Sequence, residues 1–402
     1  MSRPIRILYD EWGFQETHGG VSRLFSEVMK NLPEGFEWIL PQTSTVNEYL
    51  KEPPFNLPPA KLIFGDFIKE KCRGRYFPGA FHVYKLLANL FPKKFPAYEV
   101  NSLKSRRRAV AKGDYDIYHC GALDWKGLPE GRPMVATVCD LIPEIISKDQ
   151  MMKNYRRRIL TAASHIIAIT EYTKHDVMEM YGIPSQKITV IYLGYNMGVS
   201  GLMEKSDVWK DPYVVFIGKR AGYKNFKWMV RALAPYLRGE AHGMENGRKL
   251  RLFCTGTPFT SDEQALFREL RVEGQITQKF VTDGEMRKAL HGAICFIHPS
   301  LYEGFGIPIL DAFAAECPVL LANASCFPEV GGDAALYFNP SDMEDFQNKL
   351  DRLLDPSNIG FRNQLVIKGK ERVKSFSWKR CAEETASVYQ MVYDRYLGGK
   401  LT

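Results

Sequence analysis

The stretch AICFIHPSLYEGFGIPILDAFAAECPVLLA, residues 293–322, holds two short apolar runs separated by a glycine-containing loop and an apolar segment of helical length. The runs AICFIH (293–298) and PVLLA (318–322) have the length and composition of buried strands. Pro308 has the fixed φ that suits the first turn of a helix. A strand, a helix and a second strand in this order predict a parallel β-α-β unit.

The same alternation of apolar strands and amphipathic segments extends over the whole chain. Further strands are expected at 5–9, 36–40, 116–119, 134–139, 165–170, 188–192, 213–218, 250–255 and 335–338. Helices are expected at 21–32, 225–237, 262–274 and 377–397. We therefore predict an α/β protein with two doubly wound domains, residues 1–200 and 201–378, followed by a terminal helix in residues 379–402.

Length and composition agree with this organisation. At 402 residues the chain is too long for one core, and its 45% hydrophobic and 25% charged residues are typical of a soluble globular protein. The N-terminus lacks a signal-peptide core, and no apolar stretch approaches the ~18–20 residues that span a bilayer. Eight scattered cysteines without a C-x-x-C pair indicate neither a zinc site nor a disulfide framework. We expect a reduced, cytoplasmic protein.

The net charge of +8 is concentrated in one segment, residues 69–112. Twelve Lys and Arg residues there are opposed by only Glu70 and Glu99, and seven aromatic residues lie among them. A basic surface with aromatics suits the anionic inner face of a cell membrane. A solvated basic face over core aromatics is an equally good explanation, and nucleic acid binding is disfavoured.

Two acids flank the glycine loop of the opening stretch. Glu303 precedes Gly304, and Asp311 follows Pro308 in the expected first turn of the helix. Glycines let backbone N–H groups approach a ligand, and these dipoles keep nearby carboxylates ionised. Carboxylates accept hydrogen bonds from the hydroxyl groups of a sugar or ribose. Stabilisation by the helix dipole alone would also explain Asp311, whereas Glu303 has no such local reason.

Positive charge is supplied by a second loop, in YVVFIGKRAGYKNF, where Lys219, Arg220 and Lys224 follow a strand. Cations at this position can hold a diphosphate and neutralise a leaving group. In the first domain, Gly19 and Gly20 precede a helix whose N-terminus can bind an anion. Because ligands bind beyond the carboxyl ends of parallel strands, these loops should meet between the domains.

Other catalytic motifs are missing or misplaced in the sequence. Asp114-Tyr115-Asp116 has the form of a metal-binding Asp-x-Asp, but it lies at the entry of a strand, so we interpret it as a solvated turn and predict no catalytic metal. Asp116 and His119 could form a base and its orienting acid, although structural polar residues at a strand end are more common. G-x-G-x-x-G after the first strand, a P-loop and G-x-S-x-G are absent.

The stretch SLYEGFGIPILDAFAAECPV (300–319) resembles the E-x7-E signature of the retaining glycosyltransferases of family 4, which have the GT-B fold. The resemblance covers nearly the whole chain and includes TVCDLIPE, ITEYTKHDVMEMYGIP, ITVIYLGYN and SCFPEVGGDAALYFNP. It implies two Rossmann-like domains facing across a cleft, with the last helix crossing back onto the first domain.

The resemblance also implies a role for each matching residue. Glu303 would hold the donor hexose with the backbone of Phe305 and Gly306, and Asp311 would hold the ribose. Arg220 and Lys224 would bind the diphosphate, and either Lys219 or Arg220 would face it. Gly19 and Gly20 would close over the diphosphate from the first domain, and Asp140 would keep its acceptor-side place or be structural.

Three positions depart from the family pattern. Asp311 stands where the family usually has Glu, Cys139 stands where relatives often carry His, and Glu316 replaces a common glycine. The shorter Asp311 side chain weakens the ribose assignment, and no acceptor-side role can be transferred to Cys139.

The resemblance predicts a metal-independent retaining hexosyltransferase without a cofactor. Its donor would be a GDP- or UDP-linked sugar, with GDP-mannose slightly favoured, and its acceptor a glycan or lipid-linked oligosaccharide in polysaccharide biosynthesis. The alternatives are a sugar phosphorylase or sugar-nucleotide epimerase on the same fold, or a non-catalytic basic binding protein.

Overall fold

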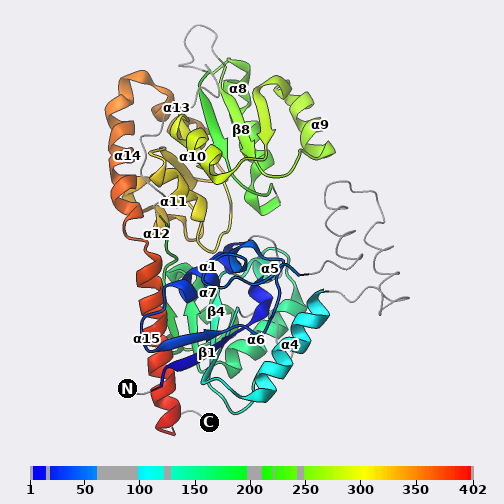
Figure 1. Cartoon of the computed structure of the whole chain (residues 1–402). Coiled ribbons are helices and arrows are strands. Elements are labelled where there is room, and N and C mark those ends of the chain that lie inside the picture. The colour runs from blue at the N-terminus through cyan, green and yellow to red at the C-terminus, as the bar shows by residue number, and fades with distance from the viewer. Residues whose placement is uncertain are drawn as a thin grey trace, which may run out of the picture.

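The computed structural model describes residues 3–14, 19–60, 98–121, 128–196, 211–220, 222–241 and 249–399, with side chains from residue 105 onward in the helix that begins at 98. Most of the basic segment 69–112 therefore lies outside the described residues. The described chain forms two halves, each built on a parallel β-sheet, and one long C-terminal helix that runs beside the first half (Figure 1).

The first sheet has the order β2-β1-β3-β4-β5-β6, and all of its strands are parallel. Its strands are β1 (Ile5–Tyr9), β2 (Phe36–Ile39), β3 (Ile117–Cys120), β4 (Met134–Val138), β5 (His165–Ala168) and β6 (Ile188–Val190). The strand order changes direction between β1 and β3, because β2 lies on one side of β1 and every later strand on the other.

Both faces of the first sheet are covered, because neighbouring side chains of a strand point to opposite faces. In β1, Ile7 belongs to the core cluster of α1 (Gly20–Lys30), and Leu8 belongs to the cluster of α6 (Gln150–Ala162). The other described helices of this half are α4 (Tyr98–Lys112), α5 (Ile142–Ile145), α7 (Glu171–Tyr181), and the short 3-10 turns η1 (Glu11–Phe14), η2 (Glu48–Leu50) and η3 (Ser185–Lys187).

The second sheet has the parallel order β12-β11-β10-β7-β8-β9. Its strands are β7 (Tyr213–Phe216), β8 (Arg251–Thr255), β9 (Ile276–Lys279), β10 (Cys295–His298), β11 (Val319–Ala322) and β12 (Leu336–Phe338). The order reverses between β7 and β10, and in sheets of this kind the reversal point is where ligands bind.

Helices of the second half form two groups, in which α8 contacts α9 and α13, and α11 contacts α10 and α14. Their bounds are α8 (Phe226–Arg238), α9 (Ser261–Leu270), α10 (Asp283–His291), α11 (Ile307–Ala314), α12 (Phe327–Gly331), α13 (Met343–Leu354) and α14 (Ile359–Val373). The 3-10 turns are η4 (Gly222–Lys224), η6 (Glu273–Gln275), η7 (Gly332–Ala334) and η8 (Pro356–Asn358).

The chain crosses between the halves twice, and the two crossings lie side by side. The amide of Tyr195 in the first crossing donates to the carbonyl of Phe376 in the second, at 3.2 Å. The second crossing leads into α15 (Trp378–Leu397), which packs on α1 and β5 of the first half. Tyr389 of α15 is fully buried there and shares a 2.7 Å hydrogen bond with the hydroxyl of Tyr9 in β1.

The predicted α/β class with two doubly wound units and a returning C-terminal helix is confirmed. The domain boundaries at 200 and 378 stay predictions. Each strand expected from the sequence is present, with ends that differ from the expected ones by at most two residues, but β9 was not predicted. β9 has the sequence ITQK at the sheet edge, and only Ile276 in it is buried, so it lacks the apolar signal of a central strand.

Candidate active site

The reversal point of the second sheet brings two of the predicted loops together. β7 and β10 are neighbours, so the segment after β7 (217–225) and the segment after β10 (299–306) leave the same sheet edge side by side. The backbone N–H of Leu301 donates to the carbonyl of Tyr223 at 2.8 Å and joins the two segments directly.

Glu303 lies at the centre of this pair of loops. Its carboxylate oxygen Oε1 forms an ion pair with the ammonium of Lys224 and accepts a 3.2 Å hydrogen bond from Nε2 of His298. The hydroxyl of Ser325 binds the Glu303 backbone on both sides, accepting from its N–H at 3.0 Å and donating to its carbonyl at 2.6 Å. Glu303 is only 8% exposed, so this carboxylate is held firmly by its neighbours.

The charge state of Glu303 follows from these contacts. Burial by itself would raise the pKa of the carboxyl, but the hydrogen bond from His298 and the ammonium of Lys224 outweigh burial and hold the pKa well below its usual range. Burial lowers the pKa of His298, so its imidazole is neutral at pH 7 and donates through Nε2–H. The site therefore presents an ionised carboxylate beside one cation.

Residues of the first half close this site from the other side. The hydroxyl of Tyr302 accepts from the amide of Leu141 at 3.3 Å and donates to Asp176 at 2.6 Å. The hydroxyl of Thr170 donates to the carbonyl of Gly304 at 3.2 Å. Leu141 follows β4 and Thr170 follows β5, so loops at the carboxyl ends of both sheets meet at the segment that carries Glu303.

Asp140 is an acid of the first half whose charge interacts with Glu303 and Lys224. Burial raises the pKa of Asp140, and Glu303 raises it further, whereas Arg156 and Lys224 act in the opposite direction. Its Oδ1 accepts from the amide of Ile142 at 3.0 Å, which fixes the turn after β4. Burial raises the pKa of the neighbouring Cys139 thiol to about 12, so this thiol is protonated at pH 7.

Asp311 lies in α11, one residue beyond the first turn predicted for it. Burial raises the pKa of its carboxyl, while Arg23 of α1 and a hydrogen bond with Tyr195 act to lower it. The low pKa of Glu303 comes from His298 and Lys224 rather than from the predicted N–H dipoles. That such dipoles keep Asp311 ionised stays a prediction. Gly19 is the N-cap of α1 and Gly20 its first residue, so the helix that carries Arg23 begins at the predicted glycine pair.

The guanidinium of Arg220 is held by hydrogen bonds to other protein groups. Its Nε donates to Glu263 of α9 at 2.7 Å, and its Nη2 donates to the carbonyls of Thr257 and Pro258 at 2.7 and 2.9 Å. Its Nη1 is buried and has no hydrogen-bond partner among the described residues. Lys219 is exposed, and Lys224 contacts Glu303. The three predicted cations therefore differ in their partners: Lys224 pairs with the central carboxylate, and Arg220 pairs with Glu263.

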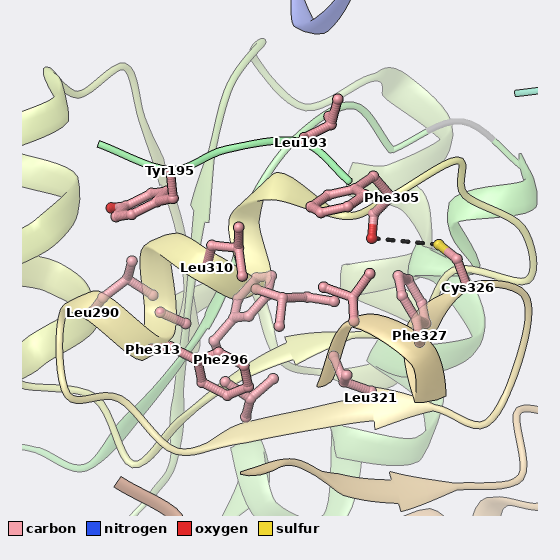
Figure 2. Packing of buried hydrophobic residues seen from close by; sticks show 14 of the residues in the cluster. Leu193, Tyr195, Leu290, Phe296, Phe305, Leu310, Phe313, Leu321, Cys326 and Phe327 are labelled. Carbon is pink, nitrogen blue, oxygen red and sulfur yellow. Dashed lines mark hydrogen bonds between the residues drawn. The ribbon is translucent and has the colours of Figure 1, made fainter. Parts of the chain in front are cut away.

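Phe305 and Gly306 connect the loop to the core. Phe305 is 3% exposed and packs against Tyr192 of the first crossing and Phe376 of the second, with ring centroids 6.5 and 5.6 Å away. Figure 2 shows Phe305 among buried residues that include Leu310 and Phe327, and it shows the Phe305 carbonyl, which accepts from the thiol of Cys326 at 3.3 Å. Gly306 has φ +93° and is the N-cap of α11, a backbone conformation that favours glycine.

The alternative motifs form structural contacts. Asp116 binds Arg3 through two hydrogen bonds of 2.7 and 2.8 Å, and it is buried, so the interpretation as a solvated turn was wrong for this residue. His119 binds Thr137 and Tyr389 instead of Asp116. Within the described ranges, no group of three or more His, Cys, Asp or Glu side chains could hold a metal ion.

Sequence reasoning missed two contributors to the site. His298 is the last residue of β10, and a polar residue ending an otherwise apolar strand was the available signal. Glu329 of α12 accepts from the amides of Glu171 and Tyr172 at 2.6 and 3.1 Å, so it caps the N-terminus of α7 in the other half. Nothing in its local sequence pattern indicates that long-range contact.

Each half of the chain matches a known protein family. Residues 71–198 match the family Glycosyltransferase Family 4, and residues 211–356 match Glycosyl transferases group 1. The chain is 26% identical to O-antigen chain mannosyltransferase B of Escherichia coli, over 75% of this chain and 81% of the relative. It is 24% identical to the MMP alpha-(1->4)-mannosyltransferase of Mycolicibacterium hassiacum, over 75% of this chain and 77% of the relative.

Solved structures share the fold at low identity. HepE of Anabaena, in complex with UDP and glucose, superposes with a TM-score of 0.68 at 15% identity, covering 96% of this chain and all of that one (100%). A glycosyltransferase from Rickettsia africae superposes with a TM-score of 0.65 at 17% identity, covering 97% and 99% of the two chains. With two family matches, one in each half, and this shared architecture, the chain belongs to the glycosyltransferases of the family 4 type and has the GT-B fold.

Proposed function

We propose that this glycosyltransferase moves a hexose from a nucleotide-diphospho-sugar to a glycan or lipid-linked oligosaccharide, with retention of the anomeric configuration and without a metal ion. The observation that carries the proposal is the ion pair between the buried Glu303 and the half-buried Lys224 at the reversal point of the second sheet. It supplies an acceptor for sugar hydroxyls next to a cation that can neutralise a departing diphosphate.

In the proposed reaction, Glu303 orients the donor hexose and Lys224 stabilises the negative charge that develops on the leaving diphosphate. The acceptor hydroxyl attacks the anomeric carbon from the face on which the phosphate departs. The phosphate oxygen takes the hydroxyl proton as the bond to the anomeric carbon breaks. Gly19 and Gly20, at the N-terminus of α1, contribute N–H groups to the diphosphate, and Asp311 binds the ribose.

Mannose is the hexose we favour, because two relatives that cover three quarters of the chain are mannosyltransferases by name. One of them acts on the O-antigen chain, which supports a role in polysaccharide biosynthesis. The base stays open between GDP and UDP, since HepE is a UDP complex but shares only the fold.

The first experiment is a thermal-shift screen of the purified chain against GDP-mannose, UDP-glucose, UDP-galactose and UDP-N-acetylglucosamine, followed by product analysis with each donor that stabilises it. A ligand at ~100 times its dissociation constant stabilises by about 2.7 kcal/mol, which such a screen detects. Turnover that requires inorganic phosphate would indicate a phosphorylase, and absence of both binding and transfer across the panel would contradict the proposal.

The second experiment replaces the central acid. Glu303→Ala should lower kcat at least ~10²-fold, the scale of a lost polar contact in the transition state, while binding of the free nucleoside diphosphate survives. Glu316→Ala, an exposed acid paired with Lys370, is the matched control and should keep full activity. Near-normal turnover of Glu303→Ala would remove Glu303 from the mechanism.

Metal removal is a third experiment. Activity of the native chain should persist in excess EDTA. A loss of activity that added Mg²⁺ or Mn²⁺ restores would overturn metal independence.

A further inference from the structure

His298 lies directly beneath the central carboxylate. It ends β10, is 2% exposed, and its Nε2 lies 3.2 Å from Oε1 of Glu303. Its ring packs between Phe327 and Phe296, with centroid distances of 4.6 and 5.5 Å. The imidazole therefore has one fixed orientation, with Nε2 toward Glu303.

We propose that His298 is a positioning residue that holds the Glu303 carboxylate in its working orientation by donating a hydrogen bond from a neutral imidazole. The inference rests on the function proposed above, because it concerns the same carboxylate. His298 itself does not touch the substrate.

The surroundings favour the neutral donor. The charged groups that face this imidazole are Glu303 and the ammonium of Lys224 from the neighbouring turn η4, with Asp140 of the first half acting on the same carboxylate. The imidazole also contacts two aromatic rings, which offer no solvation to an imidazolium. The Nδ1 atom is buried without a hydrogen-bond partner among the described residues, which fits a tautomer protonated at Nε2 alone.

The two donors to Glu303 bind the same oxygen. Lys224 and His298 both contact Oε1, and they come from different elements, so together they fix the rotation of the carboxylate. Oε2 carries no hydrogen bond from the described residues, and it is the oxygen left to accept from a sugar hydroxyl. A carboxylate held by Lys224 alone would rotate about that single contact and exchange its two oxygens.

Two variants test the role. His298→Phe keeps an aromatic ring between Phe296 and Phe327 but removes the donor, and kcat should fall about 10–100-fold, the scale of a hydrogen bond to a charged group. Its affinity for the nucleoside diphosphate should stay within about twofold of wild type. His298→Gln returns an N–H donor near the position of Nε2 and should recover most of the lost kcat.

A direct readout separates this inference from the proposed function. The Glu303 carboxyl can be titrated by ¹³C NMR in glutamate-labelled protein, with Glu303→Gln identifying its signal. Loss of the donor destabilises the ionised form, so the Glu303 pKa should rise by about one unit in His298→Phe, and the acid limb of the kcat profile should move to higher pH by the same amount. His298→Gln should show neither change.

The outcomes are distinct. A raised Glu303 pKa in His298→Phe, in a protein that transfers no sugar from any donor, would support the positioning role and refute the proposed function. A Glu303 pKa and kcat unchanged in a folded His298→Phe variant would overturn the positioning role. Equal losses in the Phe and Gln variants, accompanied by lower unfolding temperatures, would show that His298 only packs the core.

Discussion

At the scale of single residues, neighbours decide which of the similar side chains in one loop takes part in the site. Lys224 and Arg220 come from the same segment, but Lys224 meets Glu303 while Arg220 is held by Glu263 and two backbone carbonyls. Arg220 also lies over the ring of Phe259 at 4.8 Å. We therefore propose Lys224 ahead of Arg220 as the diphosphate cation, because Nη1, the Arg220 nitrogen without a hydrogen-bond partner among the described residues, is buried.

Asp311 gives a prediction at this scale. If it binds the ribose, Asp311→Asn should weaken nucleoside diphosphate affinity about tenfold, because an amide is a poorer partner than a carboxylate for a diol. Asp311→Glu should be tolerated. Isothermal titration calorimetry measures both, with Asp333→Asn, an exposed acid of the second half that pairs with Lys368, as the control. Unchanged affinity in Asp311→Asn would show that the acid serves only α11 and its contacts with Tyr195 and Arg23.

At the scale of elements, the segment 299–306 follows β10 of the second sheet, but it also contacts the first half of the molecule. Tyr302 and Gly304 of this segment bind groups after β4 and β5 of the first half. A Cβ on Gly304 would overlap the carbonyl oxygen of Cys139, so the two halves can approach this closely only with glycine there. The position of Glu303 is thus coupled to the approach of the first half.

Gly304→Ala tests that coupling. The added methyl group forces the loop away from Cys139, and we expect about 1–3 kcal/mol of lost stability, typical of overpacking, together with at least a tenfold lower kcat. Gly274→Ala is the matched control, because a Cβ there meets nothing within 4 Å. Thermal unfolding and steady-state kinetics measure the two effects. A Gly304→Ala variant as stable and active as the control would show that the halves need not meet at this loop.

At the scale of the whole molecule, only some of the described basic residues in the segment 69–112 lie on the surface. Arg106 belongs to the predicted basic segment 69–112, but it is fully buried and pairs with Asp10 and Glu11 at 3.1 and 3.6 Å, so it is not part of an exposed basic surface. Arg107, Arg108 and Lys112 are exposed on α4. Within the described part of the chain, every helix is too short or too polar to cross a bilayer.

Association of the basic segment with an anionic membrane stays a prediction. Arg107→Ser with Arg108→Ser should lower co-sedimentation with vesicles containing anionic lipid at low salt, since each basic residue near such a surface contributes on the order of 1 kcal/mol. Binding should fade as salt shortens the Debye length. Lys368→Ser with Lys370→Ser, on α14, removes the same charge from the other half and should have no effect. If the native chain ignores anionic vesicles at low salt, the basic residues form ordinary solvated surface.

The sequence by itself determined the class of fold and most of its elements. Apolar runs bounded by glycine and proline, such as IRILY and YVVFIG, can be satisfied only in sheets buried on both faces, and local patterns carry that information. Pro308 and Gly306 marked the start of α11 for the same reason, because backbone preferences are local. The weakly apolar edge strand β9 was not predicted, because its pairing depends on the neighbouring strand β8 rather than on its own residues.

Only the tertiary structure decided which polar side chains meet. Glu303 and Lys224 are 79 residues apart in sequence, and their pairing follows from β7 and β10 being neighbours. The commitment of Arg220 to Glu263, the burial of Arg106 and the contact of His298 with Glu303 are likewise products of packing. Side-chain charge and hydrogen bonding act over a few ångströms in space, so a sequence pattern names the chemical groups available, and the fold selects the partners that give each of them its chemistry.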